Sequence, residues 1–392
     1  MRILILSFYY HPDLSAGSFR TSALVKALLE RLPENAHVHL VTTLPNRYSS
    51  FSNEAPEYEG HSRLSVHRVA LPAHKSGMID QSKAFLSYAR GVLKLVKTKQ
   101  YDLVYATSSR LLTATLGAFV ARRLRTLLYL DIRDIFVDTI KDVLPRKIAL
   151  LSSPFFSLLE SWTIRGACKV NLVSAGFLPY FKSRYPQQQF SLFTNGIDEE
   201  FVKEQPVNEI PTGEGVLTVL YAGNMGEGQG LHTIVPPLAK RFEGRLRFRL
   251  IGDGGRRKQL ADALAAENCS NVSLLPPVGR AALIDEYKSA DVLFLHLNDY
   301  EAFKKVLPSK LFEYGAVGKP IWAGVAGYAS EFVNANLINA VTFKPCCVDE
   351  AYAAFGKLRL YTAARGEFVE RFSRVNIMQG MACDIINSIR RA

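Results

Sequence analysis

The segment 308–320, read P-S-K-L-F-E-Y-G-A-V-G-K-P, carries two charged side chains at a spacing that could do chemistry. Pro308 and Ser309 are typical of a helix start, because proline is tolerated in the first turn and a serine hydroxyl can cap free N–H groups. Lys310 and Glu313 lie three residues apart, so they share one helix face near its positive end. There a carboxylate can accept hydrogen bonds from a diol such as a ribose, and N–H groups can meet a phosphate.

The same spacing also fits an amphipathic helix whose two charges are only solvated. Leu311, Phe312 and Val317 would then pack inward, and Gly318 would end the helix before the apolar run at 321–323. On spacing alone this interpretation is the simpler one. The choice therefore depends on what the other elements place beside this helix.

Two glycine-rich loops in the second half of the chain follow expected strands. The first, G-N-M-G-E-G-Q-G at 223–230, follows a strand at 216–222, and the second, G-D-G-G at 252–255, follows a strand at 247–251. Each leads into a helix, so its backbone N–H groups can approach an anion at a positive helix end. A single loop of this kind is often only a turn. Both loops should nevertheless reach the same sheet edge as the helix at 310, which suits a nucleotide diphosphate.

The first half opens with the same kind of unit, a strand at 2–10, a loop and a helix at 19–32. The loop contains only Gly17, and the absence of G-x-G-x-x-G argues against a dinucleotide site. Arg20, at the helix entrance, is either a contact for a phosphate or an acceptor, or a solvated charge.

A later strand at 127–131 ends in the sequence D-I-R-D. Asp131 and Arg133 could be active-site groups at a strand end, or members of a structural ion pair centred on Arg133. The spacing is not the D-x-D that a metal-bridged sugar nucleotide would use. We therefore expect no metal at this position.

Strands and helices alternate through both halves, which predicts two α/β domains with parallel sheets. We place the N-terminal domain at 1–200, the C-terminal domain at 215–375, and a C-terminal helix at 376–392 that returns to the first half. The helical pattern that contains this helix runs without a break over roughly 367–389. The segment 199–214, rich in Pro and Glu, is the expected linker, and the polar segment 45–61 is expected to be a mobile loop.

Charge, cysteine content and hydropathy indicate which kinds of ligand and which cellular compartment suit this chain. The formal net charge of +12 suits a phosphate-bearing ligand or an anionic membrane, while no zinc-finger or basic-aromatic RNA-binding motif points to nucleic acid. The five cysteines form no C-x-x-C pair, and no targeting signal or membrane-spanning run is present, so we expect a cytosolic protein, soluble or peripheral. The apolar and basic segment 141–165 is either a core helix pair or a lipid-facing patch.

Six segments of the chain resemble, in sequence and in their order, segments of the retaining GT-B glycosyltransferases of glycosyltransferase family 4. Within that family the resemblance is closest to the bacterial O-antigen and capsule-type enzymes. The six segments are S-F-Y-Y-H-P-D-L-S-A-G-S, T-N-G-I-D, Y-A-G-N-M-G-E-G-Q-G-L, L-I-G-D-G-G, S-A-D-V-L-F-L and P-S-K-L-F-E-Y-G-A-V-G-K-P-I. The resemblance spans essentially the whole chain. It implies two doubly wound, Rossmann-like parallel-sheet domains facing a central cleft, with the donor on the C-terminal domain and the acceptor on the N-terminal one.

The activity implied is metal-independent transfer, with no cofactor, of a sugar of N-acetylhexosamine type. The donor would be a nucleotide diphosphate sugar, UDP-linked, and the acceptor a glycan or a lipid-diphosphate-linked glycan at the inner face of the cytoplasmic membrane. The nucleotide-sugar site would be formed by Gly17, Gly223, Asn224, Gly252, Gly254, Pro308, Ser309 and Glu313, and the acceptor side by Arg20, Asp131 and Arg133.

Glu313 matches the second Glu of the family's E-x7-E motif, which holds the ribose hydroxyls. This sequence departs from the family pattern at two places. Lys305 stands where the first Glu of the motif would be, and Gly228 and Gln229 stand near the places of the Arg and Lys that often follow the Y-A-G strand. Stabilisation of the departing diphosphate would then fall to Lys305, Lys310 and the loop N–H groups.

Two other classes fit the same fold. A nucleotide-sugar 2-epimerase would need acid and base residues around the sugar, and a non-catalytic sugar-nucleotide-binding protein would bind without turnover. Nucleotide release that depends on an acceptor would distinguish a transferase from both.

Overall fold

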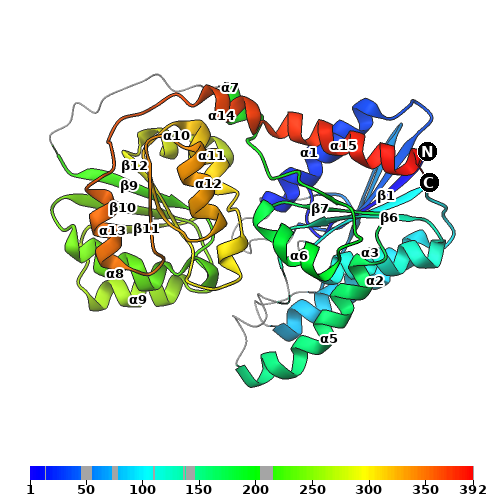
Figure 1. Ribbon diagram of the computed structural model, residues 1–392, viewed down its shortest axis with the longest axis horizontal. Helices are drawn as coiled ribbons and strands as arrows, with labels where there is room; N and C mark the ends of the chain where they lie inside the picture. The colour runs from blue at the N-terminus through cyan, green and yellow to red at the C-terminus, as the bar shows by residue number, and fades with distance from the viewer. Residues whose placement is uncertain are drawn as a thin grey trace. The chain divides into compact units, whose positions relative to one another are not determined.

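The computed structural model describes residues 1–13, 15–45, 55–72, 78–108, 111–135, 137, 146–203 and 215–391. The chain folds into two compact units, Met1–Asn195 with Arg374–Ala392, and Gly196–Ser373 (Figure 1). Most of the expected mobile loop at 45–61 and most of the expected linker at 199–214 lie outside the described residues.

The first unit is built on an eight-stranded sheet of order β3-β4-β2-β1-β5-β6-β7-β8. Apart from β3, its strands are parallel and buried in the middle of the sheet, where apolar side chains face both layers of helices. The strands are β1 (Arg2–Leu6), β2 (His37–Thr43), β3 (Tyr58–His61), β4 (Leu64–Val69), β5 (Leu103–Thr107), β6 (Leu127–Ile132), β7 (Lys169–Leu172) and β8 (Phe190–Ser191).

Strand β3 corrects two of the expectations from sequence. It lies within the segment predicted as a loop, and it runs antiparallel to β4, so this sheet is not wholly parallel. The two strands pair from Tyr58 opposite His67 to His61 opposite Leu64, which leaves only two residues for the turn. A turn this short joins antiparallel strands only, whereas a parallel neighbour needs a long crossover.

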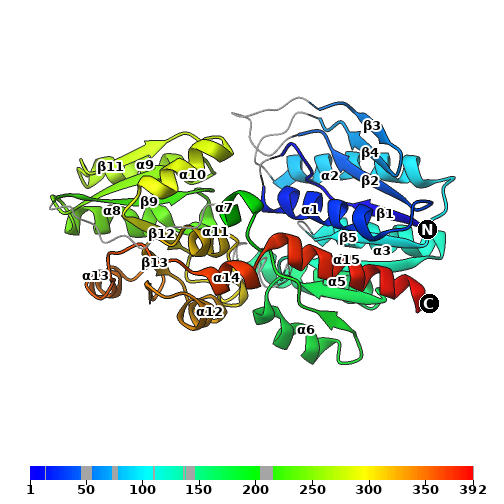
Figure 2. The same ribbon diagram turned by 90° about the horizontal axis from the view of Figure 1, so that it is seen from above.

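Helices cover both faces of this sheet, with α1 and α15 on one face and α2 and α3 on the other (Figures 1 and 2). Helix α15 packs along α1, where Met378, Met381 and Ile385 meet Leu24 and Leu28 in one buried core. The helical segments of this unit are α1 (Ala16–Arg31), α2 (Met78–Val96), α3 (Leu111–Leu124), α5 (Arg146–Ile164), η1 (Ala175–Phe177), α6 (Leu178–Arg184) and α15 (Arg374–Arg390).

The last helix, expected to run without a break over 367–389, is interrupted at Phe372 and Ser373. It ends once as α14 (Gly366–Arg371) in the second unit and begins again as α15 in the first. Ile197 causes the break, because its N–H donates to the Phe372 carbonyl at 2.7 Å and it forms a β-bridge with Ser373. A backbone paired in this way cannot continue the helical ladder.

The second unit contains six parallel strands in the order β11-β10-β9-β12-β13-β14. This is the doubly wound order. Successive strands are added outward on one side of β9 up to β11, and the next strand, β12, is then added on the other side of β9. The strands are β9 (Leu217–Ala222), β10 (Leu246–Ile251), β11 (Val272–Leu275), β12 (Val292–His296), β13 (Ile321–Gly324) and β14 (Ala340–Phe343). Ligands of such sheets bind beyond the carboxyl ends of the strands, at the point where the strand order changes side.

The core of the second unit lies between this sheet and α8, α9 and α13, where Trp322 and Phe242 are both buried. Helices α10, α11 and α12 cover the other face (Figure 1). The helical segments are α7 (Glu199–Lys203), η2 (Glu227–Gln229), α8 (Leu231–Arg241), α9 (Arg257–Ala266), α10 (Arg280–Ser289), η3 (Phe303–Lys305), α11 (Lys310–Val317), α12 (Tyr328–Asn336), α13 (Val348–Phe355) and α14. No helix in the described part of the chain has both the length and the apolar character needed to cross a bilayer.

A buried histidine on β2 is expected to make the stability of the first unit depend on pH. His39 on β2 is 2% exposed, and its Nε2 lies 2.9 Å from Nδ1 of His67. Burial, with the nearby charge of Lys99, lowers the pKa of His39 to about 3. In the unfolded chain a histidine titrates near its ordinary value of about 6.5.

We therefore expect the free energy of unfolding of the first unit to fall as pH drops from about 6.5 toward 3. Across that window the unfolded chain binds a proton that folded His39 does not, and at pH 5 the loss from this residue is about 2 kcal/mol. Urea unfolding at pH 7, 6 and 5 measures it. A His39→Gln variant should lose this part of the slope, and an equal slope in both proteins would contradict the expectation.

Candidate functional site

The two glycine-rich loops of the second unit lie side by side, as expected from their positions after neighbouring strands. The N–H of Gly223 donates to the Ile251 carbonyl at 2.8 Å, and the N–H of Met225 donates to the Asp253 carbonyl at 2.8 Å. Glycine is needed at Gly252, because its φ is +145° and a Cβ there would collide with the Gly223 carbonyl. The loop backbones therefore pack closely at the carboxyl ends of β9 and β10.

The side chain of Lys310 reaches these loops from α11. A Cβ added to Gly223 would collide with the Lys310 Nζ, and that nitrogen also lies 5.3 Å from the centroid of the Tyr221 ring. Lys310 itself is half-buried. The structure thus brings together Gly223, Gly252, Gly254 and a positive charge, which is the convergence inferred from the sequence.

The start of α11 differs from expectation in one respect. Ser309 does not cap the helix with its side chain, because the first turn is closed by backbone carbonyls. The Leu311 N–H donates to the Pro308 carbonyl at 3.1 Å, and the Phe312 N–H donates to the Ser309 carbonyl at 3.2 Å. The expected ending is correct, since Gly318 terminates the helix with a φ of +78°. The three apolar residues expected to pack inward, Leu311, Phe312 and Val317, are buried.

Glu313 is held by two side chains that the sequence did not single out. Its Oε1 accepts from Arg280 Nη1 at 2.9 Å and its Oε2 accepts from the Tyr287 hydroxyl at 3.0 Å. Arg280 also donates to Asp198 at 2.5 Å. Each carboxylate oxygen retains acceptor capacity, so Glu313 is oriented and can still accept from a diol.

The charges in this cluster support one another. Burial alone would lower the pKa of Arg280, but Glu313 and Asp198 raise it. Burial, and then the Glu313 charge, raise the pKa of Tyr287 far above its ordinary value, so the hydroxyl stays protonated and donates. Arg280 and Tyr287 are seven residues apart and so share one face of α10. That spacing was the only signal in the sequence, and it does not reveal that α11 is the partner.

Gln229 lies near a position where the family resemblance predicts a basic residue. Its side chain forms hydrogen bonds within the first glycine loop. Its Oε1 accepts from Asn224 Nδ2 at 2.8 Å and from the Gly226 N–H at 3.2 Å. Asn224, predicted as a ligand contact, therefore also braces its own loop. His296, fully buried, supports the loop from below by donating from Nδ1 to the Gln229 carbonyl at 2.7 Å.

Lys305 lies in the short turn η3, half-buried. The turn reaches the first glycine loop through Phe303, since a Cβ on Gly228 would lie 2.9 Å from the Phe303 ring. The catalytic role of Lys305 stays a prediction.

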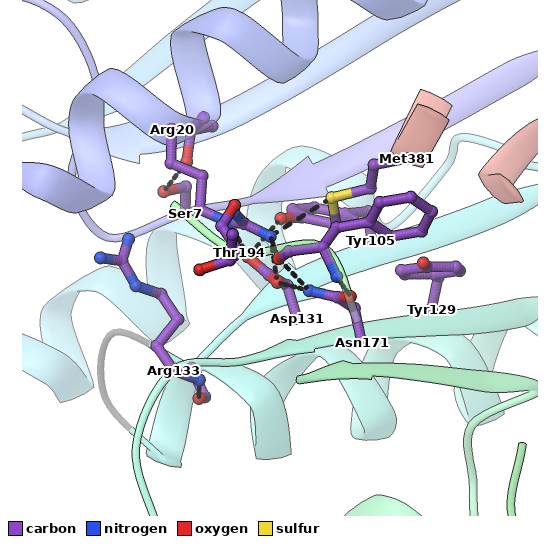
Figure 3. Close-up of polar contacts among 12 residues, drawn as sticks. Ser7, Arg20, Tyr105, Tyr129, Asp131, Arg133, Asn171, Thr194 and Met381 are labelled. Carbon is purple, nitrogen blue, oxygen red and sulfur yellow. Dashed lines mark hydrogen bonds and ion pairs between the residues drawn. The ribbon is translucent and has the colours of Figure 1, made fainter. Parts of the chain in front are cut away.

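In the first unit, Arg20 and Asp131 form a buried ion pair at the carboxyl end of the sheet (Figure 3). Arg20 Nε donates to Asp131 Oδ2 at 2.8 Å, and the two side chains are 1% and 0% exposed. Tyr105 and Asn171 also donate to this carboxylate, at 2.9 and 2.7 Å. Burial alone would raise the pKa of Asp131, but the Arg20 charge lowers it below its ordinary value.

The pair also holds the backbone just before the chain leaves the first unit at Asn195, because Arg20 donates to the carbonyls of Phe193 at 2.8 Å and Thr194 at 2.5 Å. Arg20 is therefore not a solvated charge, and the partner of Asp131 is Arg20 rather than Arg133. This geometry favours a structural role, and direct contact of Arg20 or Asp131 with an acceptor stays a prediction.

Arg133 stands apart from that cluster, and in Figure 3 its guanidinium points away from Asp131. It lies instead beside Gly17 in the first turn of α1, where a Cβ would be 2.8 Å from Arg133 Nη1. Among the described residues this buried nitrogen has no hydrogen-bond partner. Two predicted site residues, one assigned to the donor and one to the acceptor, are thus neighbours at one helix start.

Comparison with protein families gives two matches that together span most of the chain. Residues 21–189 match the model described as "Glycosyl transferase 4-like domain", and residues 202–360 match the model described as "Glycosyl transferases group 1". The first match falls in the first unit, and the second falls in the second unit with its glycine loops and α11.

One curated relative is a putative colanic acid biosynthesis glycosyl transferase, WcaI, of Escherichia coli K12. It is 30% identical over 111 residues, which are 28% of this chain and 27% of that protein, so the match spans little more than a quarter of either chain. Two solved structures are similar over nearly the whole chain. Alr3699/HepE of Anabaena in complex with UDP has a TM-score of 0.67 at 17% identity, covering 99% of this chain and 100% of that one. WaaG, a glycosyltransferase involved in lipopolysaccharide biosynthesis, has a TM-score of 0.63 at 14% identity, covering 98% and 95%.

Proposed function

Because the chain belongs to the GT-B glycosyltransferases that pair a 4-like domain with a group 1 domain, we propose that it transfers a sugar from a nucleotide diphosphate sugar. The transfer retains the anomeric configuration and uses no metal. The acceptor is a glycan or a lipid-diphosphate-linked glycan of a bacterial surface polysaccharide, at the inner face of the cytoplasmic membrane. Support for this class of pathway comes from two similar proteins, a putative colanic acid biosynthesis glycosyl transferase and a glycosyltransferase involved in lipopolysaccharide biosynthesis.

One observation carries the proposal, the position of the Lys310 ammonium against Gly223 beside a second glycine loop. Close backbone approach and a positive charge are what a diphosphate requires. In the proposed complex, the diphosphate lies over Gly223, Gly252 and Gly254, and Glu313 accepts from the ribose hydroxyls. A uridine nucleotide is proposed because the similar Anabaena structure contains UDP. The N-acetylhexosamine is proposed because the sequence resembles those of O-antigen enzymes.

The difficult step is cleavage of the bond between the anomeric carbon and the diphosphate oxygen, during which negative charge collects on the departing group. Preorganised donors directed at that charge give the largest rate effect. Lys310 and the loop N–H groups supply them. The acceptor hydroxyl then attacks from the face that the diphosphate leaves, and its proton passes to the diphosphate.

Donor turnover tests the proposal. Purified chain is incubated with UDP-N-acetylhexosamines and lipid-diphosphate acceptors, and nucleotide and sugar products are followed by mass spectrometry. Release of UDP that requires an acceptor, with a glycosylated product, is the expected result. Epimer formation without acceptor would replace the proposal by a 2-epimerase, and binding without turnover would replace it by a sugar-nucleotide-binding protein.

Replacing Glu313 with alanine should raise the donor KM and leave the fold intact. The variant loses a charged hydrogen bond to the ribose diol, worth ~1.5–3 kcal/mol, which corresponds to roughly a 10- to 150-fold change. Arg280 keeps Asp198 as a counter-charge, so no buried cation is left alone. Initial-rate kinetics measure the effect.

Glu286→Ala is the matched control, since Glu286 also pairs with an arginine in this unit, Arg249 at 2.6 Å. It should keep the wild-type donor KM. A well-folded Glu313→Ala enzyme with normal donor affinity would end the assignment of Glu313 to the ribose.

A further inference from the structure

Helices α2, α3 and α5 lie near one another in the first unit (Figure 1). An apolar groove lies between α3 and α5, with α2 at its side, and its lining residues are remote in sequence from those of the donor site. It has a volume of about 570 Å³, and all its lining residues but Thr115 are apolar. They include Leu116 and Phe119 of α3 and Phe155, Leu158, Leu159 and Trp162 of α5.

Both helices turn an apolar stripe toward this groove. On α5 the lining positions are 155, 158, 159 and 162, and on α3 they are 112, 115, 116 and 119, each with the spacing of one helix face. Phe155 and Leu158 are 62% and 72% exposed. The opposite face of α5 is the one that packs on the unit, since Glu160 is buried and accepts from the Tyr185 hydroxyl at 3.0 Å. Large exposed apolar surfaces of this kind mark sites of interaction.

Basic residues predominate on the helices that form the groove. The described side chains of α2, α3 and α5 include five basic ones, three in α2 and two in α3, against two acidic ones, Asp80 and the buried Glu160. Arg122 lies over the Trp162 ring, with its Cζ 3.9 Å from the ring centroid, so a cation stands at the edge of the apolar surface. An apolar stripe flanked by Lys and Arg is the pattern of a surface that lies in a lipid headgroup layer.

We propose that this groove docks the enzyme on an anionic phospholipid bilayer, with Phe155 and Leu158 entering the acyl boundary and the flanking arginines and lysines contacting headgroups. This inference rests on the proposed membrane-borne acceptor and adds the surface that meets the membrane. A second copy of this chain is a poorer occupant, because a twofold interface would oppose basic rims of the same sign.

Vesicle co-sedimentation tests the proposal with the full chain. Wild type should bind vesicles of phosphatidylglycerol and phosphatidylcholine at low salt, bind less as salt rises, and bind pure phosphatidylcholine weakly. The double variant Phe155→Ser, Leu158→Ser should reduce the partition coefficient about tenfold or more, since each side chain contributes apolar burial. Arg123→Gln should weaken binding to anionic vesicles only.

Matched controls come from the second unit. Ile338→Ser removes an exposed apolar side chain, 59% exposed, and Lys258→Gln removes an exposed cation, and both should bind vesicles like wild type. Vesicle binding by the double variant equal to wild type, or no binding of wild type at any ionic strength, would overturn the proposal. Dimerisation of wild type that the double variant abolishes would overturn it in favour of an interface between copies.

Donor turnover separates this inference from the proposed function. In detergent with a short-chain acceptor, where no bilayer is present, the double variant should match wild type. If wild type binds vesicles through this groove but turns over no donor, the proposed function fails and the docking surface stands. If turnover is normal and the double variant still binds vesicles, the docking surface fails and the proposed function stands.

Discussion

Lys310→Ala should lower kcat and kcat/KM together by ~10²–10³-fold, the size expected for removing one donor from a developing anion. The Lys310 ammonium lies against Gly223, where the proposed diphosphate gathers charge as its bond to the sugar breaks. An interaction made mainly in the transition state affects both constants equally. Lys310→Met, which keeps most of the apolar stem, should be nearly as slow, because the charge and not the packing is lost.

Initial-rate kinetics over a range of donor concentrations measure this effect. Lys258→Met, which removes an exposed lysine of the same unit, should leave both constants unchanged and serves as the control. Gly223→Ala should be impaired like Lys310→Ala, because its Cβ would occupy the place of the ammonium. Wild-type kcat in both Lys310 variants would transfer the role to the loop N–H groups and Lys305.

Asp131→Ala should destabilise the first unit by ~3–5 kcal/mol, since it leaves the buried Arg20 guanidinium without its counter-charge. Tyr105 and Asn171 would lose their acceptor as well. Hydrogen exchange measured peptide by peptide checks this. Protected amides of β5, β6 and β7 should exchange roughly two to three and a half powers of ten faster, whereas β9 to β14 in the second unit provide the internal control.

A double-mutant cycle tests whether the loss comes from the unpaired charge. In an Arg20→Met background no buried cation remains, so Asp131→Ala should cost at least about 2 kcal/mol less than in the wild type. The double variant should still be less stable than wild type, because the Thr194 carbonyl loses its donor and the Phe193 carbonyl keeps only that of Asn171. Equal costs of Asp131→Ala in both backgrounds would show that the ion pair is not what stabilises this unit.

The meeting of the two glycine loops with Lys310 could be predicted because it follows from local patterns and one rule of topology. Each loop directly follows a buried strand, and parallel strands end at one edge of their sheet. The apolar face of α11 and the end of this helix at Gly318 could also be predicted from the sequence, because both depend on residues within a few positions of one another.

The residues that position the site were not predictable in the same way. Arg20 pairs with Asp131 across 111 residues, and Arg280 reaches Glu313 across 33, so no local spacing records either contact. Which helix faces which is decided by packing of the whole unit. The break between α14 and α15 was not predictable for the same reason, because it depends on a hydrogen bond from Ile197 to Phe372, which is distant in the sequence.

Helix α15 has a consequence for the order in which the protein can be made. Its side chains complete the core beside α1, and Met381 contacts the buried guanidinium of Arg20. The ribosome produces this helix only after the entire second unit, so the first unit is synthesised first but completed last. Until then the apolar face of α1 that α15 covers stays exposed, and exposed apolar surface of this kind makes an incomplete chain prone to aggregation.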